Sequence, residues 1–301
     1  MPRILVVGGT GPTGERVVRR LVRKGYNVLV LTREPESEVI RALQNEGAKV
    51  REGDAVRRWT LWEALEGCDA LVSCAHLRYG DACTQACRQL GVSRLIVMSS
   101  TRRFTRFPDT ISEEVIAGES AVATSNLDWT IVRCTQIYGG RRDNNVTLLM
   151  DWFKKRNYAF IAGRGTSLIQ PVFVEDVVDG VVAALEREDA VGHALNLAGP
   201  EPLTYRRYLT EIARAAGRTS PDLYPIPVAG AVLGAKLLEP ALHRYNITAE
   251  RVRRLTEDKH ISIHLAREIL AFRPRPFTAG LQLKAEGKAE VEAMYPAPKP
   301  E

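Results

Sequence analysis

The sequence predicts an α/β protein built on a doubly wound parallel sheet, with a smaller C-terminal lobe added to it. Two observations lead to this prediction. The chain opens with an apolar run, a glycine-rich turn and an amphipathic segment over residues 3–33, and short apolar runs then alternate with helical segments up to about residue 132. Such alternation is typical of parallel strands joined by crossover helices.

The opening stretch predicts a strand, a turn, a helix and a second strand. Arg3–Val7 is a short apolar run, and four of the next seven residues are glycine. Glu15–Lys24 then places its valines and leucine at helical spacing, and Gly25 marks the helix end. Asn27–Leu31 is the next apolar run. The order is that of a βαβ unit, whose crossover is right-handed.

The rest of the first half continues the alternation. Further strands are predicted at Ala48–Arg51, Ala70–Cys74, Leu95–Met98 and Trp129–Val132. The helices between them are predicted at Trp59–Leu65, Asp81–Leu90 and Ser112–Thr124. Seven alternating elements after the opening unit favour one continuous sheet.

The second half mixes its elements and predicts a smaller lobe. Helices are expected at Val146–Lys155, Glu175–Leu185 and Tyr205–Ala216, and near 229–242, 248–256, 262–270 and 277–287. Two short strands, Pro171–Val174 and Ala194–Leu197, are expected to return to the main sheet. The predicted units are therefore 1–160 for the sheet domain, 161–292 for the mixed lobe and 293–301 for a disordered tail.

Three of the glycines in the first turn have separate physical tasks. Gly8 permits a tight turn off the strand, and Gly11 lets the backbone approach a pyrophosphate without a Cβ in the way. Gly14 lets the helix pack closely on the strand, and the N-terminus of that helix presents free N–H groups to phosphates. In this strand-turn-helix context the pattern predicts a dinucleotide site.

The spacing Gly8, Gly11, Gly14 in GGTGPTG resembles the short-chain dehydrogenase/reductase superfamily, particularly its extended members of the NAD-dependent epimerase/dehydratase type. QPVFVEDVVDGVVAAL around Asp176, LDWTIVRCTQIYG, HALNLAGPEPLT and the segment ITAERVRRLTEDKHISIHLAREILAFRPRPFTAGL also resemble that family, so the likeness covers nearly the whole chain. It implies a Rossmann fold with a substrate-side lobe. Within the family the chain looks most similar to bacterial relatives of the nucleotide-binding accessory subunit of respiratory complex I.

The choice of cofactor depends on the end of the second strand. An acid there bonds the ribose 2′-hydroxyl of NAD, and a basic residue accommodates the 2′-phosphate of NADP. Arg33 favours NADP(H), although Glu34 beside it leaves NAD(H) as the alternative, and Arg33 could instead pair with Glu34 or Glu36. The predicted cofactor contacts are Gly8, Gly11, Pro12, Thr13, Gly14, Arg33, Asp54 and Ala75.

Asp54 has two interpretations. It follows the third strand, where the resemblance implies an aspartate that contacts the adenine region. It could equally cap a helix over residues 56–65. The residue type and position do not separate these alternatives.

The family's redox-active members use a Tyr-x-x-x-Lys pair, which lies on one helix face together with a nearby Ser or Thr. Matching Glu119 to the family pattern would place the lysine at Val115 and the tyrosine at Ile111, and this chain has no Lys between Arg51 and Phe153. No Tyr stands between Gly80 and Ile137 either. The missing pair puts ordinary dehydrogenase or epimerase chemistry in doubt.

Other residues at strand ends are candidates for the acid/base role. Thr101 could keep the hydroxyl role, and His76 titrates in the right range and follows the fourth strand. Tyr79, Tyr138 and Glu114 are further candidates. A loop histidine is more often a structural hydrogen-bonding residue, so that interpretation of His76 stays open.

Charge and cysteines bound the partners and the compartment. The 301 residues carry a formal charge of +6 without a basic tract, which suits anionic ligands and gives no motif for nucleic acid. Five cysteines, an odd number without a His cluster, predict buried thiols in a reducing compartment and no metal site. Met1 leads directly into the first strand, so a cytoplasmic protein is expected.

The apolar stretch at residues 225–242 contains Lys236 and Glu239 and is short for a membrane span. It favours a core or interface helix, with peripheral membrane contact as an alternative. Two functions remain. One is a protein that holds NADP(H) for a structural, assembly or sensing role, bound to a protein partner or a membrane-associated complex. The other is an NADP-dependent oxidoreductase or epimerase/dehydratase with a replaced acid/base.

Overall fold

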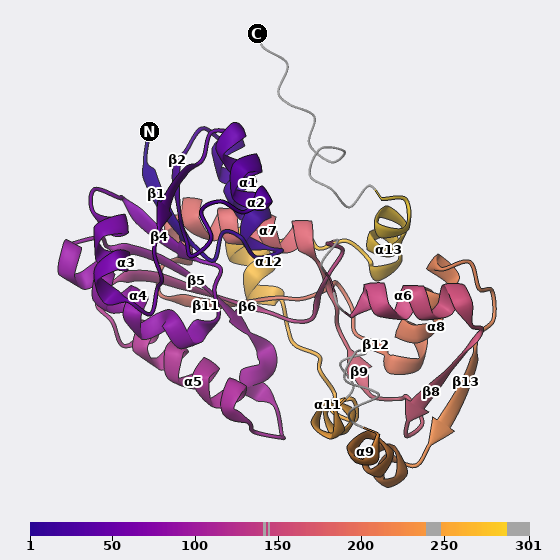
Figure 1. The fold of residues 1–301 in the computed structure, drawn as a ribbon. Helices are drawn as coiled ribbons and strands as arrows, with labels where there is room; N and C mark the ends of the chain where they lie inside the picture. Colours follow the sequence, from indigo (N-terminus) through magenta and orange to yellow (C-terminus); the bar gives the residue numbers. More distant parts are fainter. Residues whose placement is uncertain (141–142, 144, 239–247, 288–301) are drawn as a thin grey trace.

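The computed structural model, which describes residues 1–140, 143, 145–238 and 248–287, confirms the doubly wound parallel sheet (Figure 1). All seven strands run parallel, and their order reverses between β1 and β4. In spatial order they are β11 (His193–Leu197), β6 (Asp128–Cys134), β5 (Arg94–Ser100), β4 (Ala70–Ser73), β1 (Arg3–Val7), β2 (Asn27–Thr32) and β3 (Lys49–Glu52). Ligands of such sheets bind at the carboxyl ends of the strands, where the order reverses.

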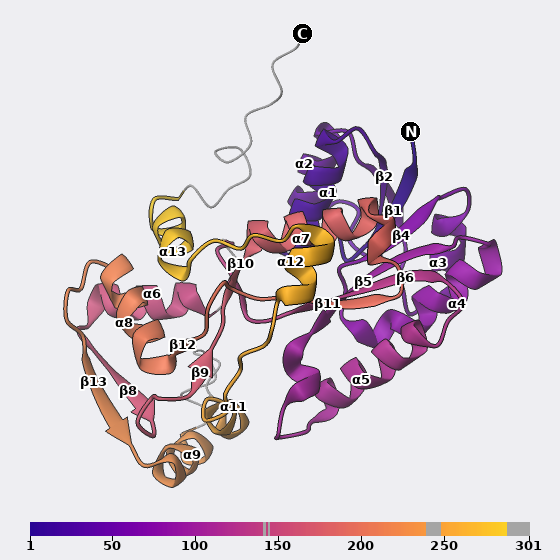
Figure 2. The ribbon, with the colours of Figure 1, turned by 180° about the vertical axis from the view of Figure 1, so that it is seen from behind.

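Helices cover both faces of the sheet, as Figures 1 and 2 show from opposite sides. One face is covered by α1 (Gly14–Arg23), α2 (Glu38–Asn45), α7 (Val174–Glu186) and α12 (His264–Leu270). The other face is covered by α3 (Arg58–Leu65), α4 (Gly80–Leu90) and α5 (Thr110–Ala123). Apolar side chains of the strands alternate between the two cores, which is why the buried strands read as continuous apolar runs.

The sequence analysis missed α2. This helix is eight residues long and half of its residues are polar, and only Ile40 and Leu43 are fully buried. A segment of about two helical turns is too short to establish a helical period. The helix packs against the first core through those two residues and the partly buried Val39.

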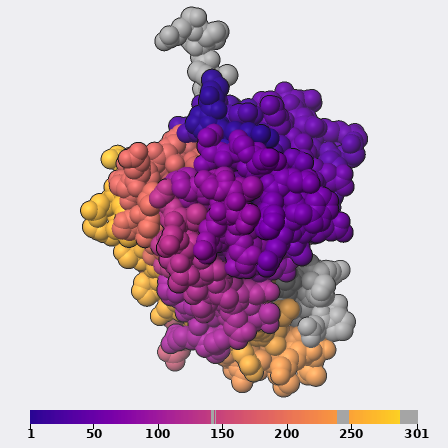
Figure 3. Space-filling view, turned by 90° about the vertical axis from the view of Figure 1, so that its left-hand side faces the viewer, coloured from indigo at the N-terminus to yellow at the C-terminus, as the bar shows by residue number. Residues whose placement is uncertain are grey.

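The C-terminal lobe has a core of its own. Its short strands pair as β7 (Ile137–Tyr138) with β10 (Val172–Phe173), β9 (Leu168–Ile169) with β12 (Leu203–Thr204), and β8 (Tyr158–Ala162) with β13 (Asp222–Ile226). Its helices are α6 (Val146–Lys155), α8 (Tyr205–Ala215), α9 (Val228–Leu237), α11 (Ala249–Arg254) and α13 (Phe277–Ala285). In Figure 3 the purple surface of the sheet domain faces the viewer, and part of this lobe is visible in orange at its lower edge.

One predicted strand pairing is wrong and the other is confirmed. Ala194–Leu197 lies in β11, which joins the sheet beside β6. The strand expected at Pro171–Val174 shortens to β10 and pairs with β7 outside the main sheet. The chain turns into α7 at Val174, so only two residues remain extended. The division near residue 160 stays a prediction.

Some sequence predictions fall outside the described residues. The tail at 293–301 lies there, as do the last residues of the helix expected near 229–242. Within the described part of the chain, no helix is long and apolar enough to cross a membrane.

Buried ion pairs fix α7 against the rest of the molecule. The Glu175 carboxylate is fully buried and accepts from Arg16 Nε at 2.8 Å and from Arg20 at 3.2 Å. The next residue, Asp176, accepts from the backbone N–H and guanidinium of Arg275 at 2.8–2.9 Å. The motif noted around Asp176 therefore joins α7 both to α1 and to the segment that precedes α13.

Candidate functional site

The glycine turn between β1 and α1 has the close contacts that its sequence predicts. Gly8 has φ +77°, and a Cβ there would lie 2.7 Å from the backbone nitrogen of Ala75. A Cβ at Gly14 would lie 2.1 Å from the Gly8 carbonyl oxygen. At Gly11 the nearest atom to a Cβ would be that same oxygen at 3.3 Å, so this position is open on its outer side. The residues present fit a pyrophosphate held at the start of α1.

Arg16 supports the turn from inside α1. Its guanidinium donates to the Pro12 carbonyl oxygen at 3.2 Å as well as to Glu175. Thr13 precedes the first residue of α1, and its side chain makes no capping hydrogen bond. The Glu15 N–H donates to the Gly11 carbonyl oxygen at 2.9 Å, and no Thr13 side-chain cap stands between this helix end and a ligand.

Arg33 follows β2 directly and is exposed. In the part of the chain that the structure describes, its guanidinium makes no ion pair, whereas Glu36 pairs with Arg41 at 3.3 Å. Glu34 is also exposed, and its N–H donates to Thr32 Oγ1. The structure therefore contradicts the alternative in which Arg33 forms a surface ion pair with Glu34 or Glu36.

Asp54 and Ala75 also follow strand ends, after β3 and β4. The Asp54 carboxylate accepts from the Val56 N–H at 3.0 Å, and its backbone bonds Thr60 Oγ1. The following helix begins at Arg58, with Arg57 at its cap position, so the interpretation of Asp54 as that helix's cap is wrong. Its predicted contact with the adenine region remains a prediction.

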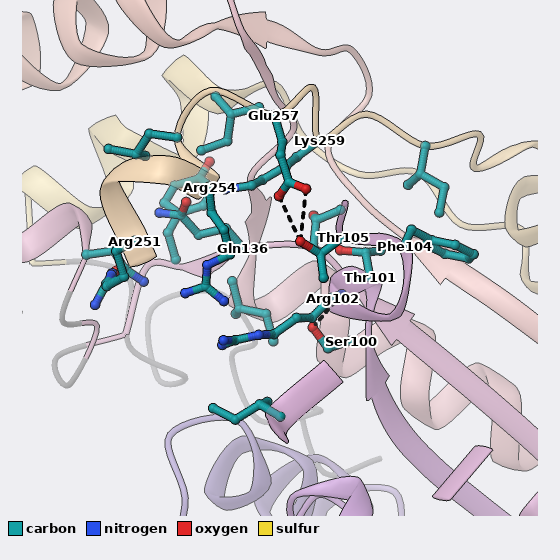
Figure 4. Close-up of a pocket in the computed structure, with 18 of the residues that line it drawn as sticks. Ser100, Thr101, Arg102, Phe104, Thr105, Gln136, Arg251, Arg254, Glu257 and Lys259 are labelled. Carbon is teal, nitrogen blue, oxygen red and sulfur yellow. Dashed lines mark hydrogen bonds between the residues drawn. The ribbon is translucent and has the colours of Figure 1, made fainter. Parts of the chain in front are cut away.

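A cavity of about 880 Å³ lies between the carboxyl ends of the strands and the C-terminal lobe (Figure 4). It reaches the glycine turn at Pro12 and Thr13 and the end of β5 at Ser100 and Thr101. Its far wall is made by α11 and by residues 257–261. A ligand there would touch both the predicted cofactor site and the second lobe, which is where substrates of such folds bind.

The structure separates the predicted acid/base candidates. Thr101 lines the cavity, and its hydroxyl lies 3.4 Å from the Cys134 carbonyl oxygen. His76 lies outside the cavity walls, where its Nδ1 accepts from the Arg78 N–H at 3.2 Å and lies 3.6 Å from Glu114. This is the structural hydrogen-bonding interpretation left open above, and it leaves the catalytic role without geometric support.

The two tyrosine candidates are also engaged. Tyr79 accepts from Arg78 at 2.7 Å. Tyr138 lines the cavity, but its hydroxyl donates to the Phe277 carbonyl oxygen at 3.1 Å, and burial raises its pKa well above the usual value. A neutral, hydrogen-bonded phenol of this kind is a poor acceptor of protons near neutrality.

Apolar side chains occupy the positions matched to the missing pair. Ile111 lies in the first turn of α5 and lines the cavity, and Val115 is buried beneath it. Glu119, one turn further, is buried and accepts from Ser99 at 2.5 Å, from Arg133 at 2.7–3.1 Å and from Arg103. This helix face therefore holds the ends of β5 and β6 in place and carries no group that moves a proton to the cavity.

The basic residues that line the cavity were not predicted from the sequence. Arg102, Arg251, Arg254 and Lys259 all line the cavity, and Figure 4 shows them around one space with Glu257. Desolvation by the cavity walls lowers the pKa of Lys259 to about 8, and the nearby arginines act in the same direction. The signal was present in the basic segment RVRRLTEDK at 251–259, but only the tertiary structure brings it opposite Arg102.

A family model described as NAD(P)H-binding matches residues 8–158, which is half of the chain and includes the glycine turn. The chain belongs to the NAD(P)H-binding family. This confirms a nicotinamide dinucleotide as the cofactor and the predicted placement among the epimerase/dehydratase-like short-chain dehydrogenase/reductases. The nearer placement beside the complex I subunit stays a prediction.

Curated relatives of this NAD(P)H-binding protein include enzymes and an assembly factor. A (4-alkanoyl-5-oxo-2,5-dihydrofuran-3-yl)methyl phosphate reductase of Streptomyces griseus is 29% identical over 91% of this chain and 95% of its own. A decarboxylating sterol-4-alpha-carboxylate 3-dehydrogenase of Mus musculus is 27% identical over 74% and 70%. The photosystem II assembly factor Ycf39 of Synechocystis is 28% identical over 44% of each chain.

Solved structures share the fold over almost the whole chain. UDP-glucuronic acid 4-epimerase from Bacillus cereus, in complex with UDP-glucuronic acid and NAD, has a TM-score of 0.74 at 15% identity and covers 95% of this chain and 98% of its own. UDP-glucose 4-epimerase from Thermotoga maritima has a TM-score of 0.71 at 18% identity, with 94% and 97% covered. At these identities the likeness concerns the fold alone.

Proposed function

We propose that this protein is an NADP(H)-dependent oxidoreductase that holds a small organic substrate in the cavity between its two lobes. The observation that supports this most is the continuity of the cavity from Pro12 and Thr13 in the glycine turn to the cationic far wall. A protein that only stored a dinucleotide has no need of a second, charged compartment next to it. The cofactor would supply hydride transfer, and the chain's own residues would bind and orient the substrate.

Arg33 supports the choice of NADP(H). Its exposed guanidinium stands at the end of β2 without an ion pair among the described residues. A 2′-phosphate there would receive a forked, charge-assisted contact. NAD(H), which lacks that phosphate, gains nothing from this residue.

Thr101 is the residue that we propose orients the substrate oxygen. It follows β5, in the wall of the cavity, and its hydroxyl would exchange the long 3.4 Å hydrogen bond that it donates to the Cys134 carbonyl oxygen for one to a substrate oxygen. Two relatives named above are a reductase and a dehydrogenase, and they extend over most of this chain. Reduction or dehydrogenation is therefore the reaction class that we favour over epimerisation.

A second candidate is a role in holding NADP(H) for assembly or sensing. The observation in its favour is the apolar pair Ile111 and Val115 where the family's tyrosine and lysine would stand. The relative named as a photosystem II assembly factor, and the resemblance to the complex I accessory subunit, point the same way. In this case a protein partner or membrane-associated complex, rather than a substrate, would be the functional ligand.

Parallel calorimetric titrations with NADPH and NADH test the cofactor. The wild-type protein is expected to bind NADPH more tightly than NADH. Arg33→Ala should lower the affinity for NADPH by roughly tenfold or more, since one charge-assisted contact is lost, and should leave the affinity for NADH unchanged. Arg41→Ala is the matched control, an exposed arginine already paired with Glu36. Equal affinities for the two cofactors in the wild-type protein would refute the NADP(H) assignment.

Hydride turnover with a panel of carbonyl compounds separates the two functions. Oxidation of NADPH that falls at least tenfold in Thr101→Val supports the oxidoreductase. Tight NADPH binding without turnover on any compound of the panel favours the assembly role.

A further inference from the structure

Four basic side chains from both lobes meet at the cavity. Arg102 comes from the short helical segment after β5 (Thr101–Phe104), Arg251 and Arg254 come from α11, and Lys259 follows α11 in the segment beside β9. Figure 4 shows the four around the same space. The sheet domain and the C-terminal lobe thus each contribute positive charge to one compartment.

Two of the four cations are neutralised within the protein. The guanidinium of Arg102 pairs with Asp109 and lies 3.0 Å from Glu250. That of Arg254 lies 3.3 Å from each of the same two carboxylates. The two arginines and two carboxylates therefore form one closed ion-pair network between α11 and the segment after β5.

Glu257 is the remaining buried carboxylate of this wall, and other groups engage it. Its two oxygens accept from Thr105 Oγ1 at 2.9 Å, and one of them accepts from the Arg106 N–H at 2.5 Å. No ion pair joins it to Lys259 in the part of the chain that the structure describes, although its charge acts on that lysine from a greater distance. Glu257 therefore fixes the loop after β5.

Arg251 and Lys259 are left without a carboxylate partner among the described residues. Among the described residues, the guanidinium of Arg251 donates only to the neutral Asn145 side-chain oxygen, at 2.7 Å. Loss of hydration and the neighbouring Arg254 lower its pKa, just as desolvation and the arginines lower that of Lys259. Partly desolvated cations that face a cavity and contact no carboxylate directly are unfavourable until an anion binds to them.

We propose that Arg251 and Lys259 bind the phosphate group of a phosphate-monoester substrate. The inference rests on the proposed function in one respect, namely that the cavity is the substrate site. Neither side chain contacts a carboxylate among the described residues, and a phosphate monoester offers three acceptor oxygens and a charge of about −1.5 to −2 near neutrality, so it can accept from both. A carboxylate has fewer acceptor oxygens and a single charge, so we expect it to bind less tightly. The phosphate would hold the rest of the molecule near Thr101, toward the glycine turn.

The probe for this site is phenyl phosphate, with benzoate as the monoanion and benzyl alcohol as the neutral comparison. Calorimetric titration of the full chain at pH 7, with and without saturating NADPH, measures the affinity for each probe. We expect phenyl phosphate to bind most tightly, benzoate less tightly and benzyl alcohol least tightly. Arg251→Gln and Lys259→Met should each lower the affinity for phenyl phosphate about tenfold or more, because each removes a charge-assisted contact. Benzyl alcohol binding should be unchanged in both variants.

Arg253→Gln is the matched control. Arg253 lies on the same helix, carries the same charge and is exposed outside the cavity walls. If Arg253→Gln lowers the affinity for phenyl phosphate as much as Arg251→Gln does, general surface charge explains the binding and the proposed site is refuted. Benzoate binding as tight as phenyl phosphate also refutes the phosphate assignment.

The pH dependence gives an independent readout. Phenyl phosphate needs the protonated Lys259, so its affinity should fall as the pH rises above about 8. The other charged groups that act on this lysine are Glu257, Arg254, Arg251 and Arg102. Lys259→Arg should bind at pH 7 and retain its affinity at pH 10. A wild-type affinity that is flat across this range refutes the role of Lys259.

The two proposals fail in different ways. Absence of NADPH binding would refute the proposed oxidoreductase and leave the phenyl phosphate series intact as a test of Arg251 and Lys259. Normal NADPH binding and turnover, with phenyl phosphate affinity unchanged in both variants, would refute the phosphate site alone. Thermal unfolding of each variant confirms that a lost affinity does not come from a lost fold.

Discussion

Gly14→Ala separates the packing task of the glycine turn from its ligand-binding task. On helix propensity alone, alanine at the first residue of α1 should stabilise the protein by up to about 1 kcal/mol. The contact opposes this, because the new Cβ would stand 2.1 Å from the Gly8 carbonyl oxygen, against a minimum of about 3.0 Å in real structures. That oxygen accepts from the Gly11 N–H at 3.1 Å, so moving it also strains a turn hydrogen bond.

Overpacking against backbone costs about 1–3 kcal/mol, and a weakened hydrogen bond adds about 1 kcal/mol. The clash therefore outweighs the propensity gain, and a net loss of about 1–3 kcal/mol is expected. In a chain of this size that loss lowers the unfolding midpoint by roughly 2–12 °C. Scanning calorimetry and urea unfolding measure it, and calorimetric titration should show NADPH binding lost with the turn geometry.

Gly11→Ala is the control for this prediction. The nearest atom to its Cβ is the Gly8 oxygen at 3.3 Å, so stability should change by less than about 1 kcal/mol. The methyl group would instead stand where the pyrophosphate approaches, and NADPH binding should weaken roughly tenfold or more. Wild-type stability in Gly14→Ala, or wild-type NADPH affinity in Gly11→Ala, would refute this account of the turn.

Three further predictions concern stability. Glu175→Gln leaves the two arginines of α1 facing a neutral group in a buried site, so it should lower the free energy of unfolding in urea by about 3–5 kcal/mol. Glu36→Gln, at an exposed ion pair, should lower it by less than about 0.5 kcal/mol. Equal effects of the two substitutions would contradict the stabilising role of the buried ion pairs. Gly234 lies in α9, where no atom of the described residues, other than its chain neighbours and the helix's own backbone, would lie within 4 Å of a new Cβ. Gly234→Ala should therefore stabilise the protein by about 0.5–1 kcal/mol, and any loss of stability would contradict the open space. Because the pKa of Lys259 is lowered in the folded protein, the unfolded chain holds that proton more tightly, and the free energy of unfolding should rise with pH between about 8 and 10.5. Lys259→Met should reduce that rise. The same pH profile in the wild-type protein and in Lys259→Met would contradict the lowered pKa.

The sheet domain was predictable because its information is local. The run Arg3–Val7, the turn glycines and the period of α1 each specify their own conformation, and the order of alternating elements then leaves few topologies. The helix at Val146–Lys155 was predicted to the residue for the same reason. The two-residue strands β9 and β12 of the C-terminal lobe were not predicted, because they have no period of their own and exist only through their partners.

The candidate site divides in the same way. By itself the sequence determined the cofactor family, through Gly8, Gly11 and Gly14, and it revealed the absence of the Tyr–Lys pair, because both are matters of which residues exist and at what spacing. Only the tertiary structure decided that His76 makes a local turn, and that Arg251 and Lys259 face the end of β5 across a cavity. Contacts between residues more than 100 positions apart depend on how the lobes pack, and charge balance in a cavity is a property of that packing.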